Sequence, residues 1–331
     1  MWTPGCTWGL DGRLRQPLND KKWGKEKAMW PSRRAEYQRI AGELANARGP
    51  LALQGLPDQA TIDTLAMQFI ASLRREDYYR LVQNKPIGAL RADPGHPSFD
   101  PERAVAYHVQ LGDIDEAGWL VFLMTHFARP LSGWQRLKDV YGRLGAGRWD
   151  WTTVIANPQA FYNWLDANWQ GIGGAFGNHR KYESLRPGAK RPMKRAVADY
   201  LAWIGPGGHA AFFANAVRTA GNNPHTIFDH LYRSLKILSF GRLAKFDYLS
   251  LVGRYGIAPI EAGSAYLDGA TGPGRGARQI FDGNPLSRTS NVNLQAKLDA
   301  LDLRLKVGMA VMEDALCNWQ KSPRRFVHYL G

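Results

Sequence analysis

Apolar residues recur at steps of three and four over most of the chain, which is the period of an amphipathic helix. No segment shows the apolar and polar alternation that is typical of a β-strand. The pattern predicts helices over residues 32–47, 58–82, 101–110, 114–127, 132–144, 157–169, 196–220 and 224–239, with another beginning at 241. A final stripe that runs from Leu294 to Met312 predicts one long helix over residues 292–320. The sequence therefore predicts an all-α fold.

Residues that favour helix ends support these boundaries. Asp100 and Pro101 mark the start of one helix, and the segment from Asp113 to Glu116 has the form of a capping box. This spacing favours a capping role for Glu116. Glu116 also belongs to the acidic stretch 93–127, so it stays a second candidate for catalysis.

The segment 241–278, GRLAKFDYLSLVGRYGIAPIEAGSAYLDGATGPGRGAR, carries the most candidate chemistry. Its first part has helical periodicity and contains Lys245 and Asp247. A carboxylate in an apolar helix costs free energy unless it is paired or used. Asp247 is therefore a candidate general base, with a buried structural pair between Lys245 and Asp247 as the alternative. Glu261 follows in the part rich in glycine and proline.

The end of that segment, GATGPGRGAR, predicts a glycine-rich loop. Backbone amides in such a loop can surround an anion, and arginine side chains can add bidentate contacts to phosphate. An ordinary surface turn between two helices is the alternative. The run lacks the GK[ST] ending of a Walker loop, and nothing in the chain indicates a bound cofactor. The candidate anion-binding residues are Gly272, Gly274, Arg275, Gly276 and Arg278.

A second candidate binding segment begins at Gly171-Ile172-Gly173, the form of the turn in helix-hairpin-helix DNA-binding motifs. In that motif, backbone amides of the turn and of the next helix contact a DNA phosphate. A set of hydrogen-bond donors and charged groups follows at Asn178, His179, Arg180, Lys181, Tyr182 and Glu183. The sequence predicts no metal site here, because His179 has no second His or Cys at ligand spacing. The basic stretch 186–195 can also be a solvated turn.

The charge of the chain indicates a polyanionic partner. The 331 residues contain 43 Lys and Arg against 29 Asp and Glu, a net charge of +14. The excess is concentrated in residues 1–48, with ten cations against five carboxylates, and in residues 171–210, with seven against two. Tryptophans interleave with the first group, at Trp2, Trp8, Trp23 and Trp30, which suits base stacking beside phosphate contacts. Nucleic acid is the expected partner.

The remaining composition limits the class of protein. No run of 18 or more apolar residues occurs, so no membrane span is expected. Cys6 and Cys317 are far apart and are expected to be free thiols in the cytoplasm. The expected organisation is a basic arm over 1–30, a helical subdomain over 31–150, and a second helical subdomain over 151–331. The second subdomain would contain the hairpin and the glycine and arginine loop, and the long C-terminal helix would close it.

Several stretches together resemble the alpha-glutamyl/putrescinyl thymine pyrophosphorylase-like proteins of bacteriophages and bacteria. They are RREDYYRLV, DPGHPSFDPERA, GDIDEAGWLVFLMTHF, GGAFGNHRKYESL, GRLAKFDYLSLVGRYG and AYLDGATGPGRGAR. The resemblance covers roughly residues 30–285. It implies an all-helical architecture related to helix-hairpin-helix DNA glycosylases, and if the chain is encoded by a phage, a place in the host cytoplasm.

The resemblance also implies a reaction on DNA. A separate kinase converts 5-hydroxymethyluracil in DNA to its pyrophosphate ester, and this enzyme displaces pyrophosphate with an amino acid or amine, glycine among the candidates. The amine must lose a proton, for which Asp247 is the first candidate. Lys245, Glu261, His179 and Glu183 are further catalytic candidates. Arg180, Lys181, Arg275, Arg278 and the glycines of residues 272–276 are expected at the leaving pyrophosphate.

One departure separates the chain from the glycosylases. Those enzymes carry a catalytic aspartate about twenty residues after the hairpin turn, where this chain has Lys190-Arg191-Pro192-Met193-Lys194. The departure disfavours cleavage of the N-glycosidic bond by that route. Three hypotheses remain: the transferase, a glycosylase-like repair enzyme, and a DNA-binding module without catalytic activity.

Overall fold

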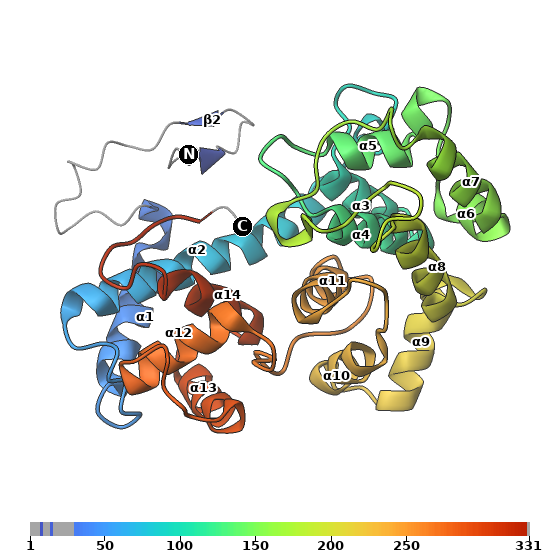
Figure 1. Ribbon diagram of the computed structural model, residues 1–331. Helices are drawn as coiled ribbons and strands as arrows, with labels where there is room; N and C mark the ends of the chain where they lie inside the picture. The colour runs from blue at the N-terminus through green and yellow to red at the C-terminus, as the bar shows by residue number, and fades with distance from the viewer. Residues whose placement is uncertain (1–6, 9–13, 16–29, 330–331) are drawn as a thin grey trace. The chain divides into compact units, whose positions relative to one another are not determined.

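The computed structural model describes residues 7–8, 14–15 and 30–329. Two short antiparallel strands, β1 (Thr7–Trp8) and β2 (Leu14–Arg15), pair near the N-terminus. All other regular elements of the described residues are helices (Figure 1). The all-α prediction is therefore confirmed for the described part of the chain.

The chain forms two compact units. Unit 1 comprises the chain up to Arg75 together with the segment from Leu267 onward, and unit 2 comprises Glu76–Tyr266. Helix α2 (Gln59–Gln83) contributes residues to both units. The boundaries at Arg75 and Tyr266 differ from the division expected at residue 150, because the C-terminal segment packs with the first helices of the chain.

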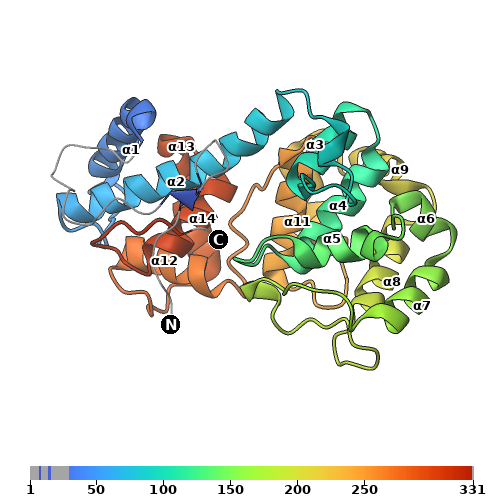
Figure 2. The same ribbon diagram turned by 90° about the horizontal axis from the view of Figure 1, so that it is seen from above.

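Unit 1 is a small helical assembly. It contains η2 (Pro31–Arg33), α1 (Arg34–Ala47), the first part of α2, α12 (Thr271–Asp282), α13 (Asn291–Leu305) and α14 (Met309–Trp319). Helix α12 packs along α14, and α13 packs against α1 (Figure 2). The stripe of Leu294, Leu298, Leu301 and Leu305 is buried, as its spacing predicts.

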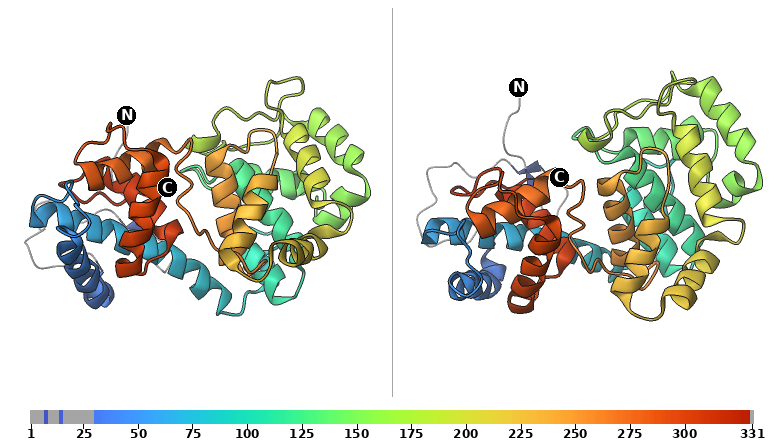
Figure 3. Two further views of the ribbon diagram at one scale, coloured as in Figure 1. Left: turned by 90° about the horizontal axis from the view of Figure 1, so that it is seen from below. Right: turned by 60° about the horizontal axis from the view of Figure 1, so that its bottom comes forward.

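Unit 2 surrounds one buried helix, α4 (Ile114–Phe127), in which every residue from Glu116 to Phe127 is buried. Helices α3, α5, α6, α9 and α11 contact it, which explains why most of its residues are apolar (Figure 3). The elements of unit 2 outside α2 and α4 are η3 (Ala89–Arg91), α3 (Pro101–Gln110), α5 (Gln135–Tyr141), η4 (Arg143–Gly145), α6 (Trp151–Ala156), α7 (Pro158–Asn168), η5 (Asn178–Arg180), α8 (Met193–Ile204), α9 (Gly208–Ala220), α10 (Pro224–Ser234) and α11 (Arg242–Arg254).

Two predicted helix starts are confirmed. The Asp100 side chain accepts a hydrogen bond from Glu102 N at 3.1 Å, and Asp113 accepts one from Glu116 N at 3.2 Å. The capping box at Asp113 is only half formed. The Glu116 carboxylate accepts hydrogen bonds from the Tyr141 hydroxyl and from Trp151 N, both at 2.6 Å. Glu116 therefore links α4 to α5 and α6.

Two predicted helices are each divided in two. The helix expected over 196–220 is interrupted at residues 205–207, where Gly205 has a φ of 79°. The helix expected over 292–320 is interrupted at residues 306–308, where Lys306 and Gly308 have φ values of 51° and 85°. The Asp302 carboxylate accepts hydrogen bonds from Val307 N and Gly308 N, which stabilises this break.

Candidate functional site

Five of the six stretches that carry the family resemblance contribute to one group of polar side chains in unit 2. We call this group the polar cluster. Its members come from the end of α2, the start of α3, the end of α4, the segment around η5, and α11. They are Glu76, Tyr78, Tyr79, Glu102, His126, Arg129, Arg180, Glu183, Asp247, Arg254 and Tyr255.

Glu102 connects three parts of the polar cluster. Its carboxylate accepts a hydrogen bond from the Tyr78 hydroxyl at 2.8 Å. It also forms an ion pair with Arg129, which donates a hydrogen bond to it at 3.2 Å. Its backbone carbonyl accepts a further hydrogen bond from the Tyr255 hydroxyl at 2.9 Å. The side chain is only 12% exposed. Burial raises the pKa of Glu102, nearby Asp100 adds to the effect, and Arg129 opposes it.

Arg254 and Glu76 form a second pair in the polar cluster. The Arg254 Nε atom lies 2.7 Å from Oε2 of Glu76, and a second guanidinium nitrogen contacts the other carboxylate oxygen. The guanidinium lies 5.5 Å from the centre of the Tyr79 ring, which packs edge-on against Tyr255. This arrangement attaches the C-terminal end of α11 to α2.

Arg180 is a buried member of the polar cluster rather than an exposed phosphate ligand. Its guanidinium donates hydrogen bonds to the backbone carbonyls of His126 at 3.1 Å and Ser239 at 2.6 Å, and lies 4.9 Å from the Phe240 ring centre. Only 5% of the residue is exposed. The predicted role at the leaving pyrophosphate is corrected, because these contacts use its donors within the fold.

Two carboxylates act electrostatically on Arg180. Burial lowers its pKa, and the negative charges of Glu183 and Asp247 oppose that effect. Asp247 also raises the pKa of Tyr79, for which burial is the main cause. Asp247 is thus within electrostatic range of both α2 and the η5 segment.

Lys245 and Asp247 do not form the buried pair considered above. Asp247 is exposed, and residues two apart on a helix do not face each other. Lys245 donates a hydrogen bond to the carbonyl of Tyr232 on α10 at 3.3 Å and lies 5.3 Å from that ring centre. Burial lowers the pKa of Lys245, and nearby Lys236 adds to the effect.

Glu183 is buried beside Arg180. Its carboxylate lies 3.9 Å from the guanidinium of Arg191, and its side chain is 3% exposed. Burial raises the pKa of Glu183, and the charge of Arg180 opposes the shift. Glu183 was predicted as a catalytic candidate, and this environment gives it a local structural role between two arginines.

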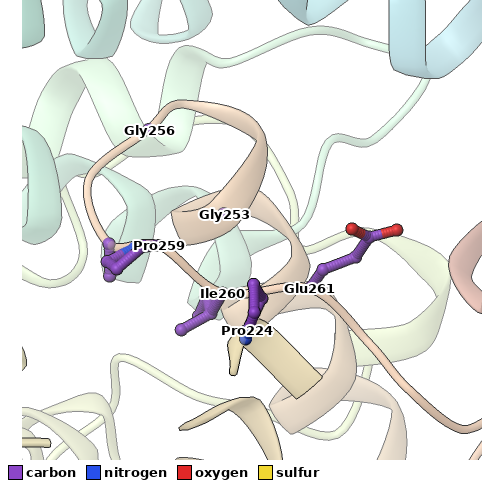
Figure 4. Close-up of a pocket in the computed structure, with 7 residues that line it drawn as sticks. Pro224, Gly253, Gly256, Pro259, Ile260 and Glu261 are labelled. Carbon is purple, nitrogen blue, oxygen red and sulfur yellow. The ribbon is translucent and has the colours of Figure 1, made fainter. Parts of the chain in front are cut away.

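Glu261 lies at a shallow hollow of about 450 Å³ on unit 2. The hollow is lined by Pro224, Gly253, Gly256, Ala258, Pro259, Ile260 and Glu261. Figure 4 shows the Glu261 carboxylate pointing away from the labelled prolines and Ile260. Its side chain is exposed and makes no hydrogen bond or ion pair with another described residue. The structure therefore does not bring Glu261 into the polar cluster.

The predicted hairpin at Gly171 and Gly173 is not followed by a second helix. After α7 the next α-helix begins at Met193, and only the 3₁₀ turn η5 lies between them. Gly173 N donates to the Asp139 carboxylate at 2.8 Å, and Arg136 donates to the carbonyl of Gly173 at 3.1 Å. The amide that was predicted to bind phosphate is therefore occupied by a carboxylate.

The residues that follow the hairpin turn present donors to solvent. Asn178, His179, Lys181 and Tyr182 are all exposed. Tyr182 is 69% exposed, and the Lys181 ammonium lies 5.1 Å from its ring centre. Four of the predicted binding residues in this segment are therefore at the surface, where they can reach a partner.

The predicted glycine-rich loop is the helix α12 in unit 1. A Cβ added at Gly276 would collide with the backbone carbonyl of Leu316 on α14, and one at Gly272 would lie 2.5 Å from the Cys317 Sγ atom. These two glycines let α12 approach α14 closely, so the prediction of an anion-binding loop built from them is corrected.

The arginines of α12 lie beside a shallow hollow of about 310 Å³, which Arg275 and Arg278 line together with Thr271 and Leu286. Arg278 donates to the carbonyls of Gly274 at 3.1 Å and Thr289 at 3.2 Å, and to the Asn291 side chain at 2.9 Å. Arg275 is exposed and has no ion-pair partner within the described residues. Arg278 therefore orders the segment after α12, while Arg275 is available to a ligand.

The basic arm over 1–30 lies mostly outside the described residues, as do Trp2, Trp23 and Cys6, and only the backbone of Trp8 is described. Trp30 is described and packs edge-on against Phe326 and His328, with the Arg74 guanidinium 4.6 Å from its ring centre. Trp30 is thus part of an aromatic contact within unit 1. Cys317 forms no disulfide.

Metal-binding groups and membrane-spanning helices are both absent from the part of the chain that the structure describes. No group of three or more His, Cys, Asp or Glu side chains is placed to hold a metal ion there. No helix in the same part of the chain has the length and apolar character needed to cross a membrane.

Sequence reasoning missed several members of the polar cluster. Glu76, Tyr78 and Glu102 were not singled out, although they lie inside the stretches RREDYYRLV and DPGHPSFDPERA. The available signal was the density of polar and tyrosine residues within those two stretches. A single sequence does not show that they meet, because Tyr78 and Glu102 are 24 residues apart and Glu102 and Tyr255 are 153 apart.

A family model described as alpha-glutamyl/putrescinyl thymine pyrophosphorylase clade 3 matches residues 60–331, well over half of the chain. The chain belongs to this family. The resemblance stated from the sequence is confirmed, and the family name implies an enzyme that acts on thymine in DNA. No curated protein and no solved structure matches the chain. The likeness to helix-hairpin-helix glycosylases therefore stays a prediction.

Proposed function

We propose that this protein is a transferase that modifies thymine-derived bases in DNA. It acts on 5-pyrophosphoryloxymethyluracil, the product of a separate hydroxymethyluracil DNA kinase. The nitrogen of an amino acid or amine forms a bond to the exocyclic carbon as the bond from that carbon to the pyrophosphate oxygen breaks. Pyrophosphate leaves, and the proton of the amine passes to a carboxylate.

Asp247 is the proposed proton acceptor. A general base must be reachable by the substrate, and Asp247 is exposed on α11, whereas Glu183 is buried and the Glu102 side chain is only 12% exposed. The carboxylate of Glu102 is also occupied by Tyr78 and Arg129. Asp247 lies within electrostatic range of the buried Arg180 guanidinium, whose pKa it raises.

The leaving pyrophosphate needs cations that stabilise its developing charge. Within unit 2, Lys181 is exposed and forms no ion pair with a described residue, so it is the proposed cationic contact to the phosphate groups of the substrate. Arg180 and Arg278 receive no direct role, because their donors bind carbonyl oxygens of the fold. Lys245 receives no role because its ammonium donates to the carbonyl of Tyr232, and Glu261 receives none because it lies at the hollow beside Pro224 and Pro259.

One observation carries this proposal. The family assignment covers residues 60–331, and five stretches of family resemblance contribute residues to the polar cluster. Residues from distant segments that converge on one polar group are typical of a functional site. Asp247 is exposed on α11, so the polar cluster reaches the surface, where a substrate can contact it.

The test is nucleoside mass spectrometry on DNA that contains 5-pyrophosphoryloxymethyluracil, incubated with the protein and all twenty amino acids. A nucleoside that is heavier than 5-hydroxymethyldeoxyuridine by the mass of one amino-acid residue, together with release of pyrophosphate, supports the proposal and identifies the nucleophile. Loss of the base supports a glycosylase instead. An unchanged nucleoside profile with tight DNA binding supports a DNA-binding module.

A further inference from the structure

The segment after η5 presents one exposed aromatic ring among cations. Tyr182 is 69% exposed, and it is the only aromatic residue among the largely exposed apolar and aromatic side chains of the described residues. The Lys181 ammonium lies 5.1 Å from its ring centre and the Arg191 guanidinium 5.9 Å. An exposed aromatic ring beside cations can stack on a nucleic-acid base while the cations contact phosphate.

The backbone around Tyr182 is held in place from both sides. Glu183 N donates to the carbonyl of Arg180 at 2.9 Å, and the Arg180 side chain is anchored in the core. Ser184 N donates to the carbonyl of Arg191 at 3.0 Å, and Met193 N donates to the carbonyl of Ser184 at 2.9 Å. These bonds close residues 184–193 into a defined loop between α7 and α8 (Figure 2).

The segment 180–195 carries positive charge that carboxylates match only in part, since Arg191, Lys194 and Arg195 pair with Glu183, Asp166 and Asp199. Residues 180–195 contain seven Lys and Arg, and the single carboxylate among them, Glu183, is buried. Lys181, Arg186 and Lys190 are exposed and form no ion pair with another described residue. The combination of an open ring and unpaired cations complements a base and its flanking phosphates.

We propose that Tyr182 is a stacking platform for an unstacked base of a DNA strand, and that Lys181, Arg186 and Lys190 contact the phosphates beside that base. The inference rests on the proposed function and adds the mode of substrate binding to it. Tyr182 directly precedes Glu183 in the chain, and Glu183 belongs to the polar cluster. An enzyme that reacts at a base must remove it from the helical stack.

The first arm of the test measures binding of a fluorescently labelled oligo-dT of about ten nucleotides by anisotropy, a length within the range of single-strand sites. This binding assay contains no amine substrate, and the DNA contains no modified base. Replacing Tyr182 by Ala is expected to weaken binding about 5- to 100-fold, and Y182F to keep it, because phenylalanine retains the stacking face. L131A is the control, since Leu131 is 86% exposed and lies outside this segment.

The second arm measures the salt dependence of the same affinity. The double variant with Lys181→Ala and Lys190→Ala should lower the slope of log affinity against log salt by about 1.4, or about 0.7 for each phosphate contact to a single strand. Y182A should leave that slope unchanged, because the ring carries no charge. A loss of affinity without a change of salt slope in Y182A, and a reduced salt slope in the double lysine variant, are expected together only if the Tyr182 ring stacks on a base and the lysines bind phosphate.

Three results would overturn the inference: Y182A binding oligo-dT within about twofold of the wild type, L131A weakening binding as much as Y182A, or tighter binding of oligo-rU than of oligo-dT. The proposed function is judged separately, by product formation on pyrophosphorylated DNA. A protein that stacks oligo-dT through Tyr182 but forms no product would keep this inference and remove the transferase.

Discussion

The Tyr78 hydroxyl lies 2.8 Å from Oε2 of Glu102, and this hydrogen bond joins the end of α2 to the start of α3. The same carboxylate binds Arg129, and the backbone carbonyl of Glu102 binds Tyr255. The pair therefore sets the position of one side of the polar cluster.

Replacing Tyr78 by Phe is expected to destabilise the protein by about 1 to 2 kcal/mol, because it removes a hydrogen bond to a largely buried carboxylate. Chemical denaturation measures the change. Y107F is the matched control, since the half-exposed Tyr107 makes no hydrogen bond through its hydroxyl within the described residues. Equal stability losses in the two variants would contradict the role given to the Tyr78–Glu102 bond.

The raised pKa of Glu116 is expected to make the free energy of unfolding depend on pH. Burial raises its pKa to about 7, from 4.5 in an exposed glutamate, while the Tyr141 and Trp151 hydrogen bonds oppose the shift. The folded state therefore holds this proton more tightly than the unfolded state. The stabilisation from that proton is complete below about pH 4.5 and is lost as the pH rises to about 7.

A Glu116→Gln variant should lose this pH dependence, because the amide stays neutral and can still bond to Tyr141 and Trp151. Between pH 5 and 7.5 the wild type is expected to lose about 2 to 3 kcal/mol more stability than E116Q. Urea unfolding at the two pH values measures this difference. The matched control is Glu43→Gln on α1, and a wild-type profile that matches E116Q would refute the prediction.

Replacing two nearby glycines of α12 by alanine is expected to change the stability of unit 1 in opposite directions. Gly276→Ala should destabilise unit 1 by about 1 to 3 kcal/mol, because the added methyl group meets the backbone of Leu316. Gly274→Ala should stabilise it by about 0.5 to 1 kcal/mol, because a Cβ there meets only the flexible Arg278 side chain and alanine favours the helix. Thermal unfolding of both variants gives the comparison. If G274A destabilised unit 1 as G276A does, the two glycines of α12 would not differ in how closely they pack, and the prediction would be wrong.

Much of the helical framework follows from local sequence signals. The apolar stripe of α13 and the caps at Asp100 and Asp113 are confirmed because each depends on residues within a few positions. Local signals failed for α12. Glycine weakens a helix by about 1 kcal/mol per residue, so the run was interpreted as a loop. Packing against α14, about forty residues further along the chain, offsets the low helix propensity of the glycines in α12.

The candidate site was predicted only in part, and for a similar reason. The place of Asp247 in an apolar helix predicts a buried carboxylate, whereas the structure places Asp247 at the surface. Arg180 was selected as an exposed ligand, and it is buried against His126 and Ser239. Which face of a segment is buried depends on tertiary contacts, and the spacing of residues 171–195 does not encode those.

The central claim is that the polar cluster of unit 2 carries the chemistry through Asp247. The most direct measurement is the single-turnover rate of pyrophosphate release from pyrophosphorylated DNA by the wild type, Asp247→Asn and the surface control Asp299→Asn. The account predicts that D247N slows release about 100-fold or more, the usual contribution of a general base, with DNA affinity nearly unchanged and D299N equal to the wild type. Release by D247N at the wild-type rate would contradict it.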